Sequence, residues 1–204
     1  MTFRDRLDAG KHLAEALKAY AHRTDVLVAG LPRGGVPVAA VVADALGAPL
    51  DVVLVRKLGM PFDSELAFGA IAEGGVQFIN ENLVSEFRLS PQIIAGIVER
   101  QQKEIERRAV MYRGSKPPEP IEGKTVLVID DGLATGATMF AAVRALRQRG
   151  AAKIVVAVPV GPRDTIAKLQ NEADGVICLH TPDYFMAVGA WYSDFRSEEH
   201  TSEL

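Results

Sequence analysis

Residues 126–139 read VLVIDDGLATGATM. Four apolar residues run directly into two adjacent aspartates, Asp130 and Asp131, and a loop of small residues follows. A continuously apolar run is typical of a strand that is covered on both faces of a sheet. In open α/β sheets, ligands bind outside the carboxyl ends of the strands. The stretch therefore predicts a parallel α/β sheet with a ligand site where this strand ends.

The loop after the aspartates has the features of a phosphate-binding site. Its side chains are small, so backbone N–H groups can approach a ligand closely. The loop also precedes a predicted helix at 137–149, and a helix N-terminus attracts anions. Two threonine hydroxyl groups add further donors. The candidate phosphate-binding residues are Ala134, Thr135, Gly136, Ala137 and Thr138.

The two aspartates need a different partner, because a carboxylate and a phosphate repel each other. Carboxylates accept hydrogen bonds from hydroxyl groups such as those of a ribose. They also bind Mg²⁺, directly or through its water molecules. Asp130 and Asp131 beside a phosphate loop therefore predict a site for a sugar phosphate.

Other sites fit the stretch less well. A P-loop requires a lysine after the second glycine, and none follows Gly136. The glycine spacing does not match a dinucleotide fingerprint, and adjacent strand residues point to opposite faces, which disfavours a glycosidase pair. A strand end and helix cap without a ligand is the plain alternative, and the whole pattern disfavours it. A phosphohydrolase acting on a sugar phosphate is a weaker hypothesis.

The rest of the chain alternates strands with helices. Strands are predicted at 25–31, 49–57, 124–129, 153–158 and 175–179. Helices are predicted within 2–20, where Thr2 and Asp5 form a capping pattern, and at 36–47, 91–113, 137–149 and 163–172, with a hairpin at 67–80. This order predicts a doubly wound parallel sheet of about five strands with a small hood or hairpin subdomain. The first and third strands should be neighbours.

Length and composition predict one domain at 1–195, with hood or mobile elements near 57–120. The segment 196–204 is polar and aperiodic, and we interpret it as a non-native or disordered tail. Lys and Arg total 23 and Asp and Glu total 26, a net charge of -3 that gives no reason to expect a nucleic-acid partner.

The chain shows no signal-peptide pattern and no apolar run long enough to span a bilayer, so we expect a cytoplasmic protein without a membrane partner. The single cysteine, Cys178, cannot form an internal disulfide and is predicted to be a core residue. The four histidines show no metal-ligand spacing.

The segment 126–138, VLVIDDGLATGAT, closely resembles the signature of type I phosphoribosyltransferases, which bind 5-phosphoribosyl-1-pyrophosphate (PRPP). The resemblance implies that Asp130 and Asp131 contact the ribose hydroxyls and that residues 134–138 bind the 5-phosphate. Gly132 is a departure, because many members have a bulkier apolar residue there. We expect this glycine to loosen the strand end without removing a ligand.

The segment 30–39, GLPRGGVPVA, resembles the family's pyrophosphate loop. A tight glycine loop with one arginine at a helix start also suits a polyanion on its own account. The resemblance implies that Arg33, Gly34 and Gly35 bind pyrophosphate. A strand-to-helix turn with an exposed arginine is the alternative.

The segment 46–61 resembles the adenine-type members, in which a strand ends in an arginine-lysine pair. Arg56 and Lys57 would add positive charge to the pyrophosphate pocket. Farther along, Arg107 and Arg108 lie in a highly charged helix that we interpret as a solvated face, although they could reach a pyrophosphate from a mobile hood.

The segment 181–195, TPDYFMAVGAWYSDF, loosely resembles the C-terminal segment of the purine members, where an aromatic residue stacks on the base. Phe185 is the candidate for that role. Two extra residues before Asp194 spoil the alignment, and an aromatic core cluster is the favoured alternative.

Together, these resemblances imply an enzyme that moves the 5-phosphoribosyl group of PRPP to a nitrogen acceptor such as a nucleobase, with release of pyrophosphate. The implied cofactor is Mg²⁺, and the implied catalytic residues are Asp130, Asp131 and Arg33. A PRPP-sensing regulatory protein of the same fold is the alternative. The acceptor is not identified, and assembly into a homo-oligomer is left open.

Overall fold

The computed structural model describes residues 2–64 and 66–195, so the predicted tail at 196–204 lies outside the described residues. A five-stranded parallel sheet has the strand order β2-β1-β6-β7-β8. Its strands are β1 (Val26–Gly30), β2 (Leu50–Val52), β6 (Thr125–Ile129), β7 (Lys153–Val160) and β8 (Gly175–His180). The prediction of a five-stranded parallel sheet is confirmed.

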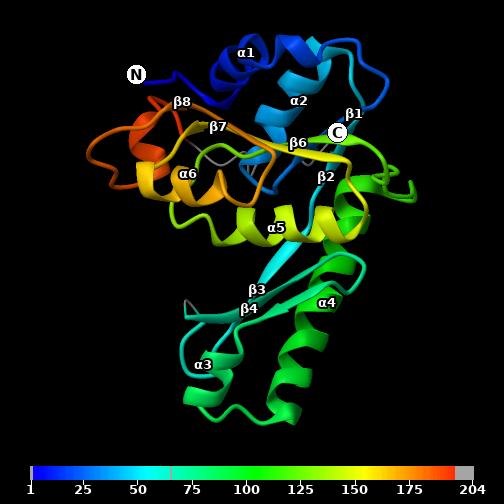
Figure 1. Cartoon of the computed structure of the whole chain (residues 1–204), viewed down its shortest axis with the longest axis vertical. Helices are drawn as coiled ribbons and strands as arrows, with labels where there is room; N and C mark the ends of the chain where they lie inside the picture. The colour runs from blue at the N-terminus through cyan, green and yellow to red at the C-terminus, as the bar shows by residue number, and fades with distance from the viewer. Residues whose placement is uncertain (1, 65, 196–204) are drawn as a thin grey trace.

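Helices cover both faces of this sheet, as a doubly wound fold requires (Figure 1). They are α1 (Arg6–Ala16), α2 (Gly35–Leu46), α5 (Ala137–Gln148) and α6 (Arg163–Leu169), with short 3₁₀ helices η1 (Lys18–Tyr20) and η2 (Val188–Trp191). Val26 and Val28 pack with α1 and α2, whereas Leu27 and Ala29 pack with α5 and α6. Because successive strand residues point to opposite faces, one apolar run supplies both cores.

A second, antiparallel sheet holds β3 (Val55–Gly59), β4 (Ala67–Ala72) and β5 (Gln77–Ile79). With α3 (Glu81–Glu86) and α4 (Pro91–Arg113) it forms a separate part of the molecule, residues 55–114, that we call the hood. The hood projects from the five-stranded sheet (Figure 1). The predicted hairpin is confirmed, and Gly74 and Gly75 have positive φ at its turn.

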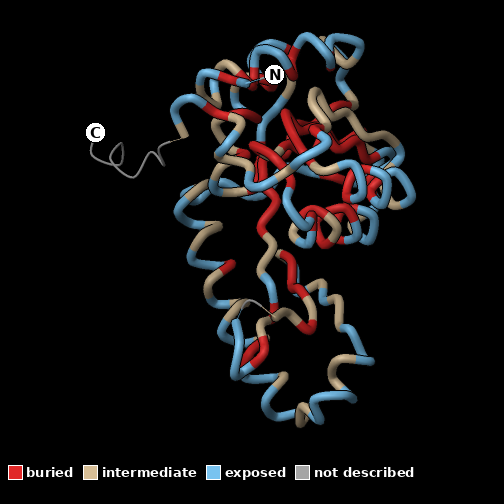
Figure 2. Tube along the Cα trace, turned by 90° about the vertical axis from the view of Figure 1, so that its left-hand side faces the viewer, coloured by how far each residue is buried: buried red, intermediate tan, exposed pale blue. Residues whose placement is uncertain are grey.

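Buried residues are concentrated in the part that contains the five-stranded sheet (Figure 2). The hood has its own smaller core, in which Leu58 and Phe68 of the hood sheet pack near Ile97 and Ile105 of α4. No helix in the described part of the chain has both the length and the apolar character needed to cross a bilayer.

Two local predictions are wrong. The strand predicted at 49–57 is two strands, because the chain leaves the parallel sheet after Val52 and enters the hood sheet at Val55. Residues 52–55 are continuously apolar across the break, so the pattern did not reveal it. The first helix begins after Asp5, whose carboxylate accepts a hydrogen bond from Asp8 N at 2.8 Å, and Thr2 is not its cap. The short helix α3 was not predicted.

Arg113, the last residue of α4, connects the two sheets through a buried network. It donates from Nε to Asp51 Oδ1 at 2.5 Å and from Nη1 to Glu73 Oε1 at 2.6 Å. It also donates from Nη2 to the carbonyl oxygen of Val52 at 2.9 Å. The other oxygen of Asp51 accepts from Glu119 N at 2.8 Å. The network lies where the chain passes from β2 into the hood.

Replacing Arg113 with alanine should therefore lower the free energy of unfolding by about 3–5 kcal/mol, because it leaves two carboxylates without their buried partner. Urea unfolding would measure the change. Arg107→Ala, on an exposed face of the same helix, should change the free energy by less than about 0.5 kcal/mol. Equal effects of the two substitutions would show that the network does not hold the hood in place.

Candidate active site

The parallel pairing of β1 with β6 brings two predicted loops together. In this register Gly30 faces Ile129, so the 33–35 loop and the acidic pair leave the sheet side by side. A Cβ atom at position 34 would lie 2.0 Å from Oδ2 of Asp131, and one at position 35 would lie 2.5 Å from the carbonyl oxygen of Ile129. Position 35 therefore requires glycine, because the backbone of β6 passes so close, and a side chain at position 34 would displace the carboxylate of Asp131.

The two aspartates occupy different environments. Asp130 lines a cavity of 140 Å³ together with the 132–139 loop and Lys57. The side chain of Asp131 is 12% exposed, and its Oδ2 lies 2.8 Å from both Nε and Nη2 of Arg6. Its backbone N–H donates to Asp130 Oδ1 at 2.8 Å, and its carbonyl oxygen accepts from Tyr192 Oη at 2.5 Å.

Burial and the neighbouring charge of Asp131 raise the pKa of Asp130 well above its usual value. A buried carboxyl group beside a second carboxylate is stabilised by hydroxyl donors or by a cation. The pair offers the oxygen ligands that Mg²⁺ prefers, and Mg²⁺ commonly takes one or two carboxylates and completes its shell with phosphates and water. No larger cluster of acidic, histidine or cysteine side chains suited to a metal occurs in the described residues.

The 134–138 loop forms the wall of the same cavity and precedes α5. Gly136 caps this helix with a φ of +75°, a conformation that favours glycine. The hydroxyl of Thr165 donates to the carbonyl oxygen of Ala134 at 2.9 Å, which fixes the loop to α6. The first N–H groups of a helix have no partner within it, so this loop can bind an anion.

A second cavity, of 570 Å³, lies between β3 and α4 and borders both loops through Pro32 and Thr138. Four of its lining residues are basic: Arg56, Lys57, Arg100 and Arg108. Burial and the neighbouring guanidinium of Arg108 lower the pKa of Arg56. Among the described lining residues none is acidic, so an anion in this cavity would offset the repulsion between its cations.

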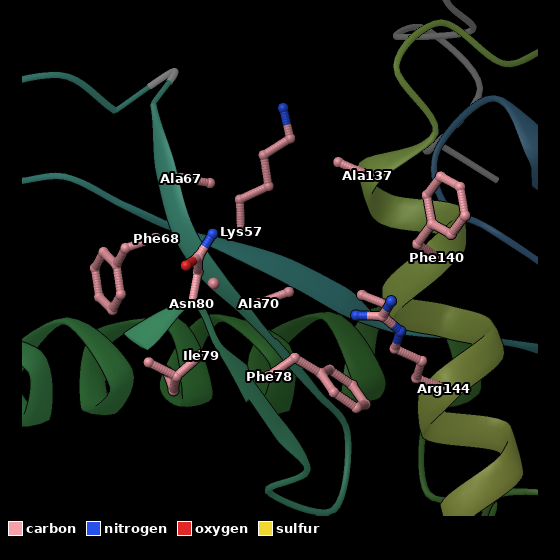
Figure 3. A pocket seen from close by; sticks show the side chains of 12 residues that line it. Lys57, Ala67, Phe68, Ala70, Phe78, Ile79, Asn80, Ala137, Phe140 and Arg144 are labelled. Atoms are coloured by element: carbon pink, nitrogen blue, oxygen red, sulfur yellow. The ribbon is translucent and has the colours of Figure 1, made fainter. Parts of the chain in front are cut away.

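A third cavity, of 490 Å³, lies between the β4–β5 hairpin and α5. Figure 3 shows Phe78 and Asn80 of the hood facing Phe140 and Arg144 of α5 across it. Arg144 is paired with Glu172, to which it donates at 3.0 and 2.5 Å. Lys57 lines all three cavities and is therefore the residue they share.

The structure separates several residues that the sequence grouped together. Arg107 and Arg108 both pair with Glu104, but Arg108 also lines the basic cavity, whereas Arg107 is exposed. Arg33 is exposed on the loop after Pro32. Cys178 packs against the core, as predicted, and burial raises the pKa of its thiol to about 11.

The C-terminal segment does not bring Phe185 into the aromatic cluster near the chain ends. That cluster contains Phe3 and Tyr192, with Trp191 and Phe195 packed against it. Gly132 does not loosen the strand end as expected. It is buried, and a Cβ atom there would lie 2.6 Å from Cγ1 of Val188, so the glycine lets the C-terminal segment pack closely.

Sequence reasoning missed three residues near the site: Arg6, Tyr192 and Arg100. Arg6 and Tyr192 are 125 and 61 positions from Asp131, so no local motif could connect them with it. Arg100 lies in a helix whose many charges gave no sign of which ones face the cavity.

Comparison with known proteins identifies the family. The chain matches the family described as "Phosphoribosyl transferase domain" over residues 62–194, more than half of its length. It is 48% identical over 193 residues to a protein of Mycobacterium tuberculosis, seen in two strains, whose name assigns it provisionally to the phosphoribosyl transferases. That alignment covers 95% of this chain and 43% of the relative, so the chain spans less than half the length of these curated relatives.

The crystal structure of TT1426 from Thermus thermophilus is 43% identical and superposes with a TM-score of 0.82, covering 97% of this chain and 93% of that one. A uracil phosphoribosyltransferase of Nocardioides sp. is 34% identical over 89 residues, 44% of this chain and 41% of that protein. The chain belongs to the phosphoribosyl transferase family. The resemblance drawn from residues 126–138 is confirmed.

The raised pKa of Asp130 predicts a cost in stability. A carboxyl group whose pKa is raised on folding binds more protons in the folded state, so the free energy of unfolding falls as pH rises from about 3.9 toward the raised value. Asp130→Asn removes this cost and keeps an oxygen acceptor for Asp131 N. Without divalent cations, the variant should be more stable than the parent at neutral pH, with the gain vanishing near pH 4.

Urea unfolding across this pH range would measure the gain, and Asp44→Asn, at an exposed position, is the matched control. A variant whose stability parallels that of the parent at every pH would show that Asp130 carries no such electrostatic cost.

Gly136→Val should abolish binding of inorganic phosphate. The backbone at +75° disfavours a β-branched residue, and a Cβ atom there would lie 2.7 Å from Cγ2 of Thr165. Gly74→Val is the control, because Gly74 has a φ of +84° but no atom near its Cβ position. Titration calorimetry with phosphate should show loss in the first variant alone. Equal affinities in both would count against the 134–138 loop as the anion site.

Proposed function

We propose that this protein is a phosphoribosyltransferase that moves the 5-phosphoribosyl group of PRPP to a nitrogen acceptor and releases pyrophosphate. The carrying observation is that the 134–138 loop, the acidic pair and the 33–35 loop lie together at the carboxyl ends of β1 and β6. Each part matches a different group of PRPP: the 5-phosphate, the ribose hydroxyls and the pyrophosphate. Family membership supports the same class of reaction.

In this proposal, binding at both anionic ends orients the ribose. The N–H groups of residues 134–138 bind the 5-phosphate, and the 33–35 loop binds the pyrophosphate, so C1 between them is held for attack. Fixing both ends before the reaction lowers its entropic barrier. Asp130 and Asp131 accept hydrogen bonds from the ribose hydroxyls and stabilise positive charge that develops on the ring.

Basic residues offset the charge that grows on the leaving pyrophosphate. Arg33, Arg56 and Lys57 are the proposed groups. Arg56 and Lys57 line the basic cavity together with Arg100 and Arg108. Donors already aimed at a developing charge stabilise the transition state more than the bound substrate. Asp130 and Asp131 would hold Mg²⁺, directly or through its water molecules, and the ion would supply further positive charge to offset that of the pyrophosphate.

The acceptor stays open within this proposal. The relative named as a uracil phosphoribosyltransferase is aligned over less than half of this chain, so it supports the class of enzyme and not the acceptor. Phe185 remains the candidate for stacking on a base. A PRPP sensor without transferase activity is the alternative that the assay below distinguishes.

The direct test is release of pyrophosphate from PRPP with Mg²⁺, assayed against purines, pyrimidines and simple amines as acceptors. A transferase should release pyrophosphate with at least one acceptor. Tight PRPP binding without release across the panel would favour the sensor. If PRPP does not bind, the proposal fails for both functions.

Arg33→Ala should lower kcat by about ten- to a hundredfold, because each charge-assisted hydrogen bond contributes roughly 1.5–3 kcal/mol. PRPP affinity should fall less, since the pyrophosphate gains charge as it leaves. Arg23→Ala is the control, because Arg23 lies before β1, at the opposite end of that strand, and pairs with Asp25. Loss of affinity with kcat unchanged would indicate a residue that binds substrate and transition state alike.

A further inference from the structure

Arg6, the first residue of α1, contacts the acidic pair that follows β6. Its Nε and Nη2 each lie 2.8 Å from Oδ2 of Asp131. Both contacts fall on the same oxygen, so they do not use Oδ1. The side chains of Arg6 and Asp131 are 15% and 12% exposed, which shields their interaction from solvent.

The guanidinium of Arg6 is itself held in place. Its Cζ lies 4.1 Å from the centroid of the Phe195 ring, in a cation–π arrangement. Tyr192, whose ring lies 5.0 Å from that of Phe195, donates to the carbonyl oxygen of Asp131. The first helix and the C-terminal segment therefore meet at this one aspartate.

The same carboxylate also lies against the pyrophosphate loop. The Cβ position of residue 34 would lie 2.0 Å from Oδ2 and 2.8 Å from Oδ1, so the oxygen that Arg6 contacts is also the one nearer to Gly34. A rotation of this carboxylate would move it against the loop. The contact with Arg6 limits such a rotation.

Charge provides a second reason for the contact. The proposed ligand is anionic at both ends, and two adjacent carboxylates lie between those ends. A cation beside Asp131 offsets one of these negative charges where the ribose would lie. Arg6 is the cation that the structure shows bonded to Asp131.

We propose that Arg6 is a positioning residue for the ribose end of the site. It holds the carboxylate of Asp131 against the 33–35 loop and offsets its charge, so that Oδ1 can accept a hydrogen bond from a sugar hydroxyl. The inference rests on the proposed function, because it takes the ligand to be a ribose phosphate.

The test compares two ligands that differ in the ribose. Inorganic phosphate needs the 134–138 loop alone, whereas ribose 5-phosphate also reaches the acidic pair. Arg6→Gln should weaken ribose 5-phosphate binding by about tenfold, the loss expected for one charge-assisted contact, and leave phosphate affinity within about twofold. Titration calorimetry would measure both affinities. A purely structural ion pair would affect both ligands equally or neither, and either result overturns the proposal.

Two variants serve as controls. Arg4→Gln removes an exposed arginine two positions away, which pairs with Asp5, and should change neither affinity. Arg6→Lys keeps the charge but loses the planar pair of donors, so it should recover part of the affinity for ribose 5-phosphate. Thermal unfolding shows whether each variant folds. If Arg6→Gln does not fold, Arg6→Lys decides alone, and a parent-like preference for ribose 5-phosphate overturns the proposal.

A double variant tests whether Arg6 acts through Asp131. Arg6→Gln should add less than about twofold when Asp131→Asn is already present, because both changes remove the same contact. Independent, multiplying losses would overturn the proposal. Failure of the proposed function looks different, since the parent protein would then bind ribose 5-phosphate no more tightly than inorganic phosphate.

Discussion

The parallel pairing of β1 with β6 is the constraint on which the site depends. It places the ends of two strands about 100 residues apart in sequence side by side, and the loops that follow them then touch. Gly34 and Gly35 pass so close to Ile129 and the acidic pair that a side chain at either position would clash. The glycines are therefore needed for the contact between the loops, whatever ligand they bind. A shift of one residue in this register would move the loops apart and reverse the faces of every β1 side chain.

The same contact creates an electrostatic problem that the surrounding elements offset. Two adjacent carboxylates lie at the carboxyl end of β6, where burial raises the pKa of Asp130. Arg6 pairs with one of them from α1, and Lys57 borders the cavity of the other from β3. One cation comes from α1, which packs on the five-stranded sheet, and the other comes from β3 of the hood. A loss of stability at the carboxyl end of β6 is the expected cost of a binding site. The hydroxyl groups of a ligand, and a cation bound with it, can then interact with the two carboxylates.

The sequence predicted those parts of the site that lie within one continuous segment. Residues 126–138 contain the strand, the aspartates and the loop together, and the fold and family followed from them. What could not be predicted depends on distant contacts. Nothing near Arg6 indicates its pairing with Asp131, and the charges around Arg108 do not reveal that it faces the basic cavity while Arg107 faces solvent. The break between Val52 and Val55 was hidden for another reason: the chain is continuously apolar across it. Val53 packs in the core of the five-stranded sheet, and Leu54 packs in that of the hood.

That break also explains why the basic cavity depends on a network outside it. Arg56 and Lys57 follow the main sheet by only a few residues, yet they belong to the hood sheet, so their position relative to the loops is set by how the hood is attached. Arg113 provides an attachment at the far end of α4, the helix that also contributes Arg100 and Arg108. Loss of Arg113 would therefore free both walls of the cavity together. Both walls lie within the hood, whose core packs β3 against α4, so the four basic residues should stay together while their position relative to the two loops changes.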